Sequence, residues 1–231
     1  MNQLNSILEE FDKKRESKKG SNWNEKAIAE CFLPCAKKIL LGGYFLVNKK
    51  YIIDLGAIEL YYHEEEGNIK DYIMYHIPER YSSPKSSVIM MEKEQGTNLP
   101  YFEFGSFNLH QSGVDVTFEN PIKKYRASFL IRSYRVLKLK DEDNVNDLTI
   151  PFDKCSTHIF DDMFYQAISF ENTKIEWIKC NKEGNVDSCP RRNTKTRVLE
   201  KDKRTGKSKI VTTDEQDLRP WQFIREGIIE K

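Results

Sequence analysis

Residues 51–62, YIIDLGAIELYY, read as one long β-strand and constrain the fold more than any other segment. Successive side chains of a strand point to opposite faces of a sheet. Glu59 and Tyr61 therefore share one face, whereas Ile58, Leu60 and Tyr62 share the other. A carboxylate beside an aromatic ring in an otherwise apolar strand indicates either a sheet edge in water or the floor of a site.

Several further segments predict that this strand belongs to an antiparallel sheet. The turn-like NKK between residues 44–47 and 51–62 is typical of a β-hairpin. Residues 63–98 are rich in glycine, proline and serine and are expected to be mostly loop. Further strands are predicted at residues 101–110, 114–118 and 127–139 and in LRPWQFIREG near the C-terminus.

Two helical segments precede the sheet, so the chain is expected to be an α+β protein. Residues 2–21 predict a helix with an apolar stripe, followed by a polar linker. We expect this helix to dock on the body or on a protein partner. Residues 23–41 predict a second helical zone, interrupted by Pro34 and closed by glycine. A third helix is predicted in DDMFYQAISF. The expected organisation is an extension over 1–22 and one domain over 23–231.

Charge gives no global indication of a nucleic-acid partner. The 231 residues include 37 Lys or Arg and 36 Asp or Glu, a net charge of +1. Nucleic-acid binding therefore requires a local basic patch. Residues 191–209, RRNTKTRVLEKDKRTGKSK, supply one, with nine basic side chains and two acidic ones. The turn-like KRTGKSK predicts an exposed hairpin tip, so a basic hairpin is expected at about 190–212.

The N-terminal residues and the cysteines bear on the compartment. Residues 1–24 lack the apolar centre of a signal peptide, and no run approaches the roughly 20 apolar residues that cross a bilayer. We expect a cytoplasmic protein without a membrane partner, with association to the nucleoid if it binds DNA. Five scattered cysteines indicate reduced thiols. A zinc site from Cys31, Cys35, Cys180 and Cys189 is an alternative, but the C-x-x-C spacing is absent, so no metal is expected.

Six short segments, in order along the chain, resemble the alkyladenine (3-methyladenine) DNA glycosylase family. No single segment is specific, and the resemblance depends on their order. Together they cover about residues 33–224. They are LPCAKKILLGGYFLV, AIELYYHEEEGNIKDYIMYHI, PYFEFGSF, ASFLIRS, CPRR and RPWQFI.

The resemblance implies a fold, an activity and a partner. The fold would be a single domain with a curved antiparallel sheet flanked by helices. The activity would be excision of a modified nucleobase in base excision repair, by base flipping and attack of water on the N-glycosidic bond. DNA would be the partner, and neither a metal nor a redox cofactor would be required.

The resemblance also assigns roles to individual residues. Glu59 falls on the general base, and Arg132 falls on the arginine beside it. Tyr61 and Tyr101 fall on aromatics that stack on the extruded base. His76 falls on the pocket histidine, although His63 competes for that role. Independently of the resemblance, an arginine on an apolar strand requires a carboxylate partner, and Glu59 is the expected one for Arg132.

Other positions match the family less closely. Phe104 falls on the side chain that intercalates into the duplex, where the family has tyrosine. Glu103 in the same hairpin would repel phosphate, and Ser106 replaces methionine. The family's phosphate-binding helix start appears here as IFDDMF. Arg191, Arg192 and the basic hairpin are expected to bind phosphate in its place.

The stretch NLHQSGVDVTF supports alternative interpretations. His110 and Gln111 would add to base binding, beside the predicted hairpin. His110 with Asp115 would instead form a hydrolytic pair for a nucleoside-like ligand, the third interpretation. The second interpretation is a non-catalytic module on the same fold that binds nucleic acid or a protein partner, because fold alone does not determine function.

Overall fold

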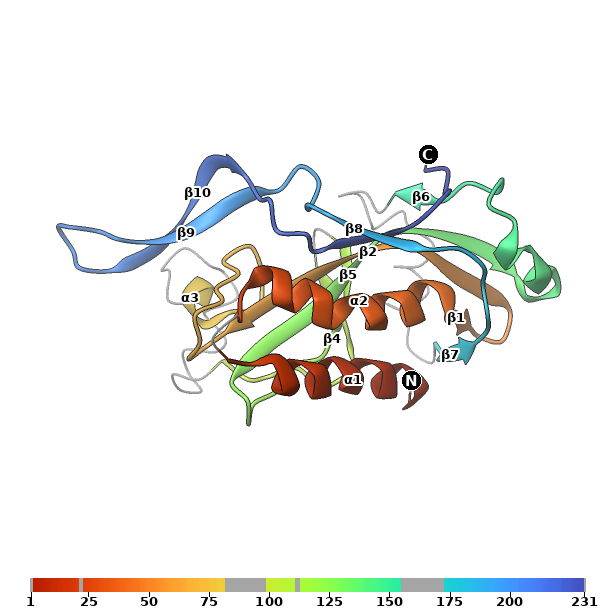
Figure 1. Cartoon of the computed structure of the whole chain (residues 1–231), viewed down its shortest axis with the longest axis horizontal. Helices are drawn as coiled ribbons and strands as arrows, with labels where there is room; N and C mark the ends of the chain where they lie inside the picture. Colours follow the sequence, from red (N-terminus) through yellow and green to blue (C-terminus); the bar gives the residue numbers. More distant parts are fainter. Residues whose placement is uncertain (1, 21–22, 82–98, 111–112, 155–172, 231) are drawn as a thin grey trace.

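The computed structural model describes residues 2–20, 23–81, 99–110, 113–154 and 173–230 (Figure 1). Two long helices and a large antiparallel sheet form the body. The helical elements are α1 (Asn2–Lys18), α2 (Glu25–Leu41), α3 (Pro78–Tyr81) and the 3-10 helix η1 (Leu139–Asn146). The strands are β1 (Gly43–Val47), β2 (Tyr51–Glu64), β3 (Phe107–His110), β4 (Gly113–Thr117), β5 (Tyr125–Lys138), β6 (Asp153–Lys154), β7 (Ile175–Lys179), β8 (Val186–Cys189), β9 (Lys195–Lys201), β10 (Ser208–Gln216) and β11 (Gln222–Arg225).

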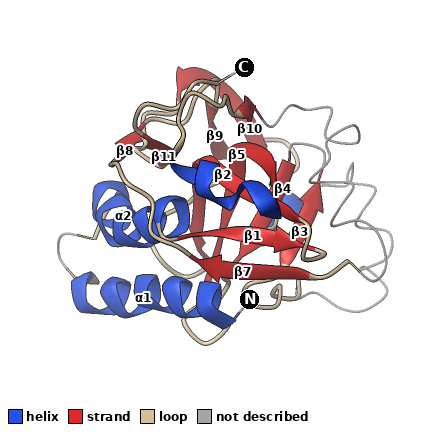
Figure 2. Cartoon of the chain, turned by 90° about the vertical axis from the view of Figure 1, so that its right-hand side faces the viewer, coloured by secondary structure: helices blue, strands red, loops and turns tan. Residues whose placement is uncertain are grey.

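The sheet is built on the two longest strands, β2 and β5, which pair antiparallel along almost their whole length. Around them the order is β3-β4-β5-β2-β1-β7, and β11 pairs with β2 and β8 beyond one end of β1. The register shifts at Gly56, where a β-carbon would lie only 2.6 Å from the Phe152 ring. Such irregularities bend a sheet, and this sheet curves into a half-barrel (Figure 2). The expected curved antiparallel α+β domain is confirmed.

Both long helices cover the same face of the sheet, side by side (Figure 2). The apolar stripe of α1 places Leu4, Leu8 and Phe11 in the main core, fully buried. Phe11 packs edge-on against rings of α2 and of the sheet. The helix predicted to dock therefore docks on the body. Removal of this much apolar surface from water is the main stabilising contribution of α1.

The expected interruption of the second helix at Pro34 is wrong, because α2 continues through it. A proline inside a helix loses one backbone hydrogen bond and costs about 3 kcal/mol. The burial of eight α2 side chains between α1 and the sheet offsets that cost. Asn24 caps the helix start by accepting a hydrogen bond from the Ala27 amide at 3.0 Å. The end falls at Gly42, as the glycine predicts.

The predicted strand over 101–110 is shorter than expected. Only Phe107–His110 is a strand, and the chain turns before it at Gly105, whose φ is +76°. That value lies in the left-handed region, which glycine adopts without steric cost. The amide of Gly105 donates to the Thr117 carbonyl at 2.7 Å, which fixes the turn beside β4. The helix predicted in DDMFYQAISF lies outside the described residues.

The strands β9 and β10 form a hairpin where the sequence predicts a basic one. They make a separate two-stranded sheet, named here the ribbon, which extends from the body at the left of Figure 1. Its tip, residues 203–207, is exposed. None of the described helices combines the length and apolarity needed to cross a bilayer.

Candidate functional site

The face of the sheet that the helices leave uncovered carries charged side chains. On β2, the side chains of Glu59, Tyr61 and His63 occupy every second position and point to this face, as strand alternation predicts. The neighbouring strand β5 contributes Leu130, directly opposite Glu59, and Arg132. The candidate site is built at this crossing of the two central strands.

Glu59 is fully buried, and two groups hold its carboxylate. The Tyr61 hydroxyl donates a hydrogen bond to Oε1 at 2.6 Å. Oε2 lies 3.3 Å from Arg132 Nε in an ion pair, which confirms the expected pairing of Glu59 with Arg132. No described donor hydrogen-bonds Oε2. A buried acceptor without a hydrogen bond costs about 1–3 kcal/mol, so the state of Oε2 calls for an explanation.

Burial raises the pKa of the Glu59 carboxyl above its usual range, against the opposing effects of Arg132 and the Tyr61 hydroxyl. The effect of burial on the pKa is the larger one because an ion leaving water loses most of its solvation. Burial also raises the pKa of Tyr61 well above its usual range, and the nearby Glu59 carboxylate adds to that shift. Tyr61 therefore stays a neutral donor, and the Glu59 carboxylate holds a proton more strongly than an ordinary carboxylate.

A cleft of about 470 Å³ opens above this pair. Tyr61, Leu130 and Arg132 from β2 and β5 line it, and Glu59 lies beneath, in contact with two of them. Ile73 and Tyr75 form one wall. The opposite wall comes from residues 192–195, Arg197 and Thr212, at the base of the ribbon.

The cleft lining is strongly basic. Its cations are Arg132, Arg192, Lys195 and Arg197, and the described lining contains no acidic side chain. Arg192 pairs with Glu230 at 3.1 Å and Lys195 with Asp214 at 3.0 Å, but both cations stay more than half exposed. Exposed ion pairs are weak and exchange readily. An anionic ligand therefore meets an excess of positive charge at this opening.

Arg191, expected to bind phosphate with Arg192, lies instead below the cleft. It is fully buried and paired with Asp71 and Asp217. Its guanidinium carbon is 4.9 Å from the centre of the Tyr61 ring, a cation–π contact that supports the ring from beneath. Burial alone would raise the pKa of Asp71. The contacts with Arg191 and Arg219 outweigh burial and bring this pKa below its usual range. Of the two arginines expected to bind phosphate, only Arg192 lines the cleft.

Tyr101 and His76 belong to a different cluster, centred on Arg126. The Arg126 guanidinium carbon lies 4.1 Å from the centre of the Tyr101 ring. His76 Nδ1 lies 2.8 Å from Glu119 Oε1 and 3.1 Å from Arg126 Nη1. Neither residue is in the cleft lining. His63, the competing histidine, is fully buried and accepts a hydrogen bond from the Asp71 amide at 3.2 Å.

The other expected residues divide between the core and undescribed positions. Phe104 is half-buried and packs against the main core. Asp115 is buried on β4 opposite Leu130, close enough to help raise the pKa of Tyr61. His110 ends β3, and its side chain, like the whole of Gln111, lies outside the described residues.

Sequence reasoning missed Tyr75, which lines the cleft and is 41% exposed. It is adjacent to the predicted His76, and adjacent loop residues point in different directions. The Arg80 guanidinium lies 4.7 Å from its ring centre and holds the ring at the wall. Tyr75 and Tyr61 are the two aromatic side chains in the described lining.

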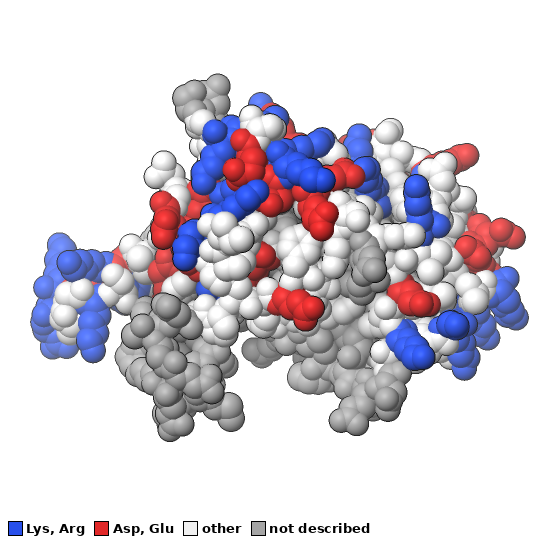
Figure 3. Space-filling view, turned by 90° about the horizontal axis from the view of Figure 1, so that it is seen from below, with Lys and Arg blue, Asp and Glu red and all other residues white. Residues whose placement is uncertain are grey.

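The ribbon continues the basic character of the cleft outward. Figure 3 shows its tip at the left as a cluster of Lys and Arg standing away from the body. The exposed cations at the tip and directly next to it are Lys201, Lys203, Arg204, Lys207 and Lys209. Among the described residues, no group of three His, Cys, Asp or Glu is arranged to hold a metal ion.

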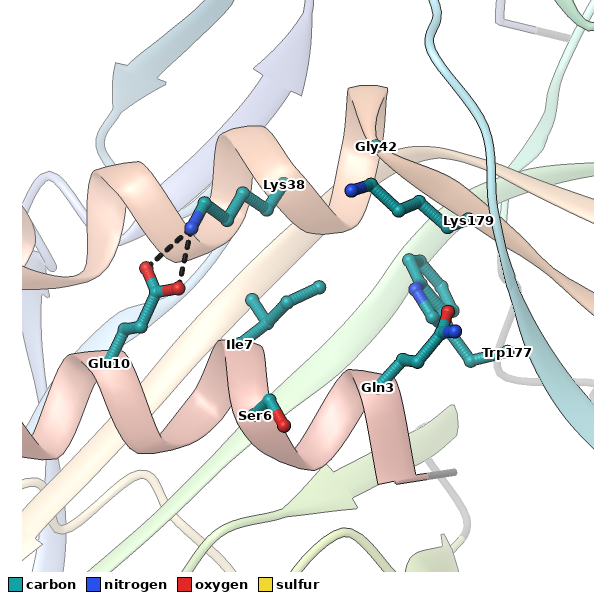
Figure 4. A pocket seen from close by; sticks show the side chains of 8 residues that line it. All are labelled: Gln3, Ser6, Ile7, Glu10, Lys38, Gly42, Trp177 and Lys179. Atoms are coloured by element: carbon teal, nitrogen blue, oxygen red, sulfur yellow. Dashed lines mark hydrogen bonds and ion pairs between the residues drawn. The ribbon is translucent and has the colours of Figure 1, made fainter.

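A second hollow of about 390 Å³ lies between α1 and α2, on the opposite side of the sheet (Figure 4). Trp177 closes one end, and Ile7 lies along its floor. Lys38 bridges its other end by an ion pair to Glu10. The described lining of the hollow has neither a buried carboxylate nor a pair of aromatic rings, in contrast to the basic cleft.

Comparisons with protein-family models, with curated proteins and with solved structures found no match to this chain.

Proposed function

We propose that this protein is a glycosylase of the alkyladenine DNA glycosylase type, which hydrolyses the N-glycosidic bond of a modified nucleotide in nucleic acid. The observation that carries the proposal is the buried Glu59 carboxylate beneath a cleft lined by four cations, with Oε2 receiving no hydrogen bond from the described residues. The curved antiparallel sheet is compatible with the resemblance in the sequence. The cations suit a phosphate backbone, and the carboxylate suits chemistry at a sugar.

In this mechanism Glu59 activates a water molecule. The carbon–oxygen bond to the sugar forms, a water proton passes to Glu59, and the electrons of the broken glycosidic bond leave with the base. Positive charge develops on the sugar in the transition state, and a carboxylate below it stabilises that charge. The raised pKa of Glu59 makes its carboxylate a stronger base than an ordinary carboxylate, which suits this role.

Arg132 controls access to Oε2 in this proposal. It lines the cleft, contacts Oε2 and is 28% exposed, so it is accessible to a ligand. When a phosphate enters, Arg132 exchanges its contact with Glu59 for a bidentate contact with the phosphate. The exchange opens a route for water to Oε2 and further raises the basicity of Glu59.

The base itself would be held between aromatic rings. A nucleobase inside a duplex is out of reach of the buried carboxylate and must be flipped out, at a cost of a few kcal/mol. Stacking on an aromatic side chain returns about 1–3 kcal/mol per base. Tyr61 and Tyr75 are the rings available in the cleft, so we assign this role to them rather than to Tyr101.

The test uses plasmid DNA treated with a methylating agent, incubated with protein and then with hot alkali, which breaks the strand at abasic sites. Wild type should generate alkali-sensitive breaks and release free modified base. The Glu59→Gln protein should bind the same DNA with unchanged affinity and release at least 100-fold less base. Base release by Glu59→Gln at the wild-type rate would overturn the mechanism.

A second candidate function is nucleic-acid binding without catalysis. It is favoured by Phe104, which packs against the main core instead of projecting as an intercalating side chain. In that case wild type would bind DNA with an affinity that falls as salt rises, and would release no base. Release of base from free nucleosides would instead support a small-ligand hydrolase.

A further inference from the structure

The ribbon has two chemically different faces. Strand alternation and the register of β9 with β10 place Lys195, Arg197, Leu199 and Lys201 on one face, with Ser208, Ile210 and Thr212 opposite them. Three of these residues, Lys195, Arg197 and Thr212, line the cleft. This cleft-side face therefore continues the cleft wall outward along the ribbon.

The cleft-side face carries more cations than acids. Glu200 and Lys209 oppose each other on the other face. Lys195 is paired with Asp214, whereas no described carboxylate is in ion-pair contact with Arg197 or Lys201. Cations without a carboxylate partner leave this face with an excess of positive charge that a polyanion can neutralise.

At the tip of the ribbon, the carboxylate of Asp202 is hydrogen-bonded to the backbone, which leaves the neighbouring cations available. Asp202 accepts backbone hydrogen bonds from Arg204 and Thr205, both at 2.9 Å. Those bonds, with the Gly206 amide donating to the Asp202 carbonyl, close the turn. The carboxylate that could neutralise Lys203, Arg204 or Lys207 is therefore engaged with the backbone.

We propose that the cleft-side face and tip of the ribbon bind the phosphate backbone of the nucleic acid whose modified nucleotide enters the cleft. The proposal rests on the proposed function for what occupies the cleft. At roughly 3.3 Å per residue, β9 spans about 23 Å. One duplex strand presents a phosphate about every 3.4 Å, so the ribbon follows about six or seven nucleotides beside the site.

The apolar residues of this face suit the same partner. Leu199 and Ile210 lie side by side between the inner cations and Lys201, and both are partly exposed. Sugar rings between phosphates offer apolar contact at this spacing. The ribbon therefore determines on which side of the modified nucleotide the protein requires flanking nucleic acid. The modified nucleotide itself is contacted only by the cleft.

The experiment compares two variants with four substitutions each. The ribbon variant is Lys201→Gln/Lys203→Gln/Arg204→Gln/Lys207→Gln, and all four positions are exposed. The matched control is Lys13→Gln/Lys14→Gln/Lys26→Gln/Lys37→Gln, exposed lysines of α1 and α2 that remove the same charge elsewhere. Circular dichroism and urea unfolding verify that both fold like wild type.

Binding is measured by fluorescence anisotropy on single-stranded and duplex oligonucleotides of increasing length, each over a salt series. The ribbon variant should lose about 10- to 100-fold in affinity for long oligonucleotides, and the slope of log K against log salt should fall by about three. On oligonucleotides just long enough to fill the cleft, it should bind like wild type. The control variant should match wild type throughout.

Outcomes of this experiment separate the two proposals. If the ribbon variant keeps the wild-type slope and length dependence, or if anionic phosphatidylserine vesicles bind wild type more tightly than nucleic acid, the ribbon proposal is overturned. If the slope falls as expected but wild type releases no base from methylated DNA, the ribbon proposal holds and the glycosylase proposal fails. A slope loss near 0.7 per charge identifies single strands as the partner, and one near 0.9 identifies duplex.

Discussion

Asp71 and Glu59 are two buried carboxylates near Tyr61, one paired with the arginine that contacts its ring and the other bonded to its hydroxyl, and their surroundings drive their pKa values in opposite directions. Asp71 is hydrogen-bonded by two arginines, and its pKa falls below the usual range. Glu59 has one ion pair with a partly exposed arginine and one tyrosine hydrogen bond, and its pKa rises. Burial is the same for both, so the supply of donors makes the difference.

This comparison distinguishes a carboxylate that stabilises the fold from one that is suited to accept a proton in a reaction. Asp71 joins three segments of the chain through Arg191 and Arg219, and every proton it could accept would break those contacts. Glu59 keeps one oxygen without a hydrogen bond, so it can take a proton at little structural cost. A catalytic base requires an arrangement like that of Glu59, whereas a carboxylate that stabilises the fold requires one like that of Asp71.

The largest expected effect is on stability, in Asp71→Asn. Removal of the Asp71 charge leaves two arginines, Arg191 and Arg219, to share Asp217 in a buried network, at a cost of about 3 kcal/mol in the free energy of unfolding. The lowered pKa means that Asp71 stabilises the fold above its unfolded-state pKa, and that this stability is lost as pH falls. Urea unfolding at pH 7 and pH 3 should show a smaller deficit at pH 3 than at pH 7. A deficit equal at both values would contradict this role.

The Glu59→Gln variant should show the opposite pH dependence. Because its folded-state pKa is raised, Glu59 contributes most below its unfolded-state pKa and loses that contribution as pH rises through the folded-state pKa. The stability of the variant relative to wild type should therefore rise between pH 4 and pH 8. Urea unfolding across that range measures the difference. A variant less stable at pH 8 than wild type would show that Glu59 is a structural anchor like Asp71.

A smaller effect is expected from Tyr61→Phe, which keeps the ring above Arg191 and removes the hydroxyl. Loss of the hydrogen bond to Glu59 should cost about 1 kcal/mol at neutral pH and less when Glu59 is protonated. That bond lowers the pKa of Glu59, so its removal should shift the pH profile of base release to higher pH. An unshifted profile would mean that the hydroxyl does not act on Glu59 during the reaction.

The smallest effect is expected at an exposed ion pair on the helical side. Lys38 and Glu10 lie 2.5 Å apart, but they are 50% and 36% exposed. Lys38→Gln should change the free energy of unfolding by about 0.5 kcal/mol or less, and salt should reduce that change further. Thermal unfolding at low and high salt measures it. A loss comparable with that of Asp71→Asn would show that burial does not rank these ion pairs.

The sequence predicted the parts of the site that depend on strand periodicity. Alternation along β2 placed Glu59 with Tyr61, and the need of a buried charge for a partner identified Arg132. Tyr101 could not be placed, because the turn at Gly105 and the path before it redirect that segment toward Arg126. Tyr75 was missed in favour of its neighbour His76, because which of two adjacent loop residues faces a cleft depends on distant packing.

The fold shows the same division. The two long helices and the central strands follow from local spacing, and Gly42 ends α2 as expected. Pro34 was misinterpreted because its local cost was visible in the sequence, whereas the burial that offsets it was not. The pairing of β11 with β2 brings residues near the C-terminus beside Glu59, and no local pattern encodes such a contact.

The most direct test of the account is a crystal structure of the protein with an oligonucleotide in which one sugar is replaced by a cationic five-membered ring. This ring imitates the charge of the transition state. We predict that it lies in the basic cleft, with Arg132 on a phosphate and an ordered water between the ring and Glu59 Oε2. A ring bound at the Tyr101–His76 cluster, or an Arg132–Glu59 pair left intact beneath a bound nucleotide, would contradict the proposed role of Glu59.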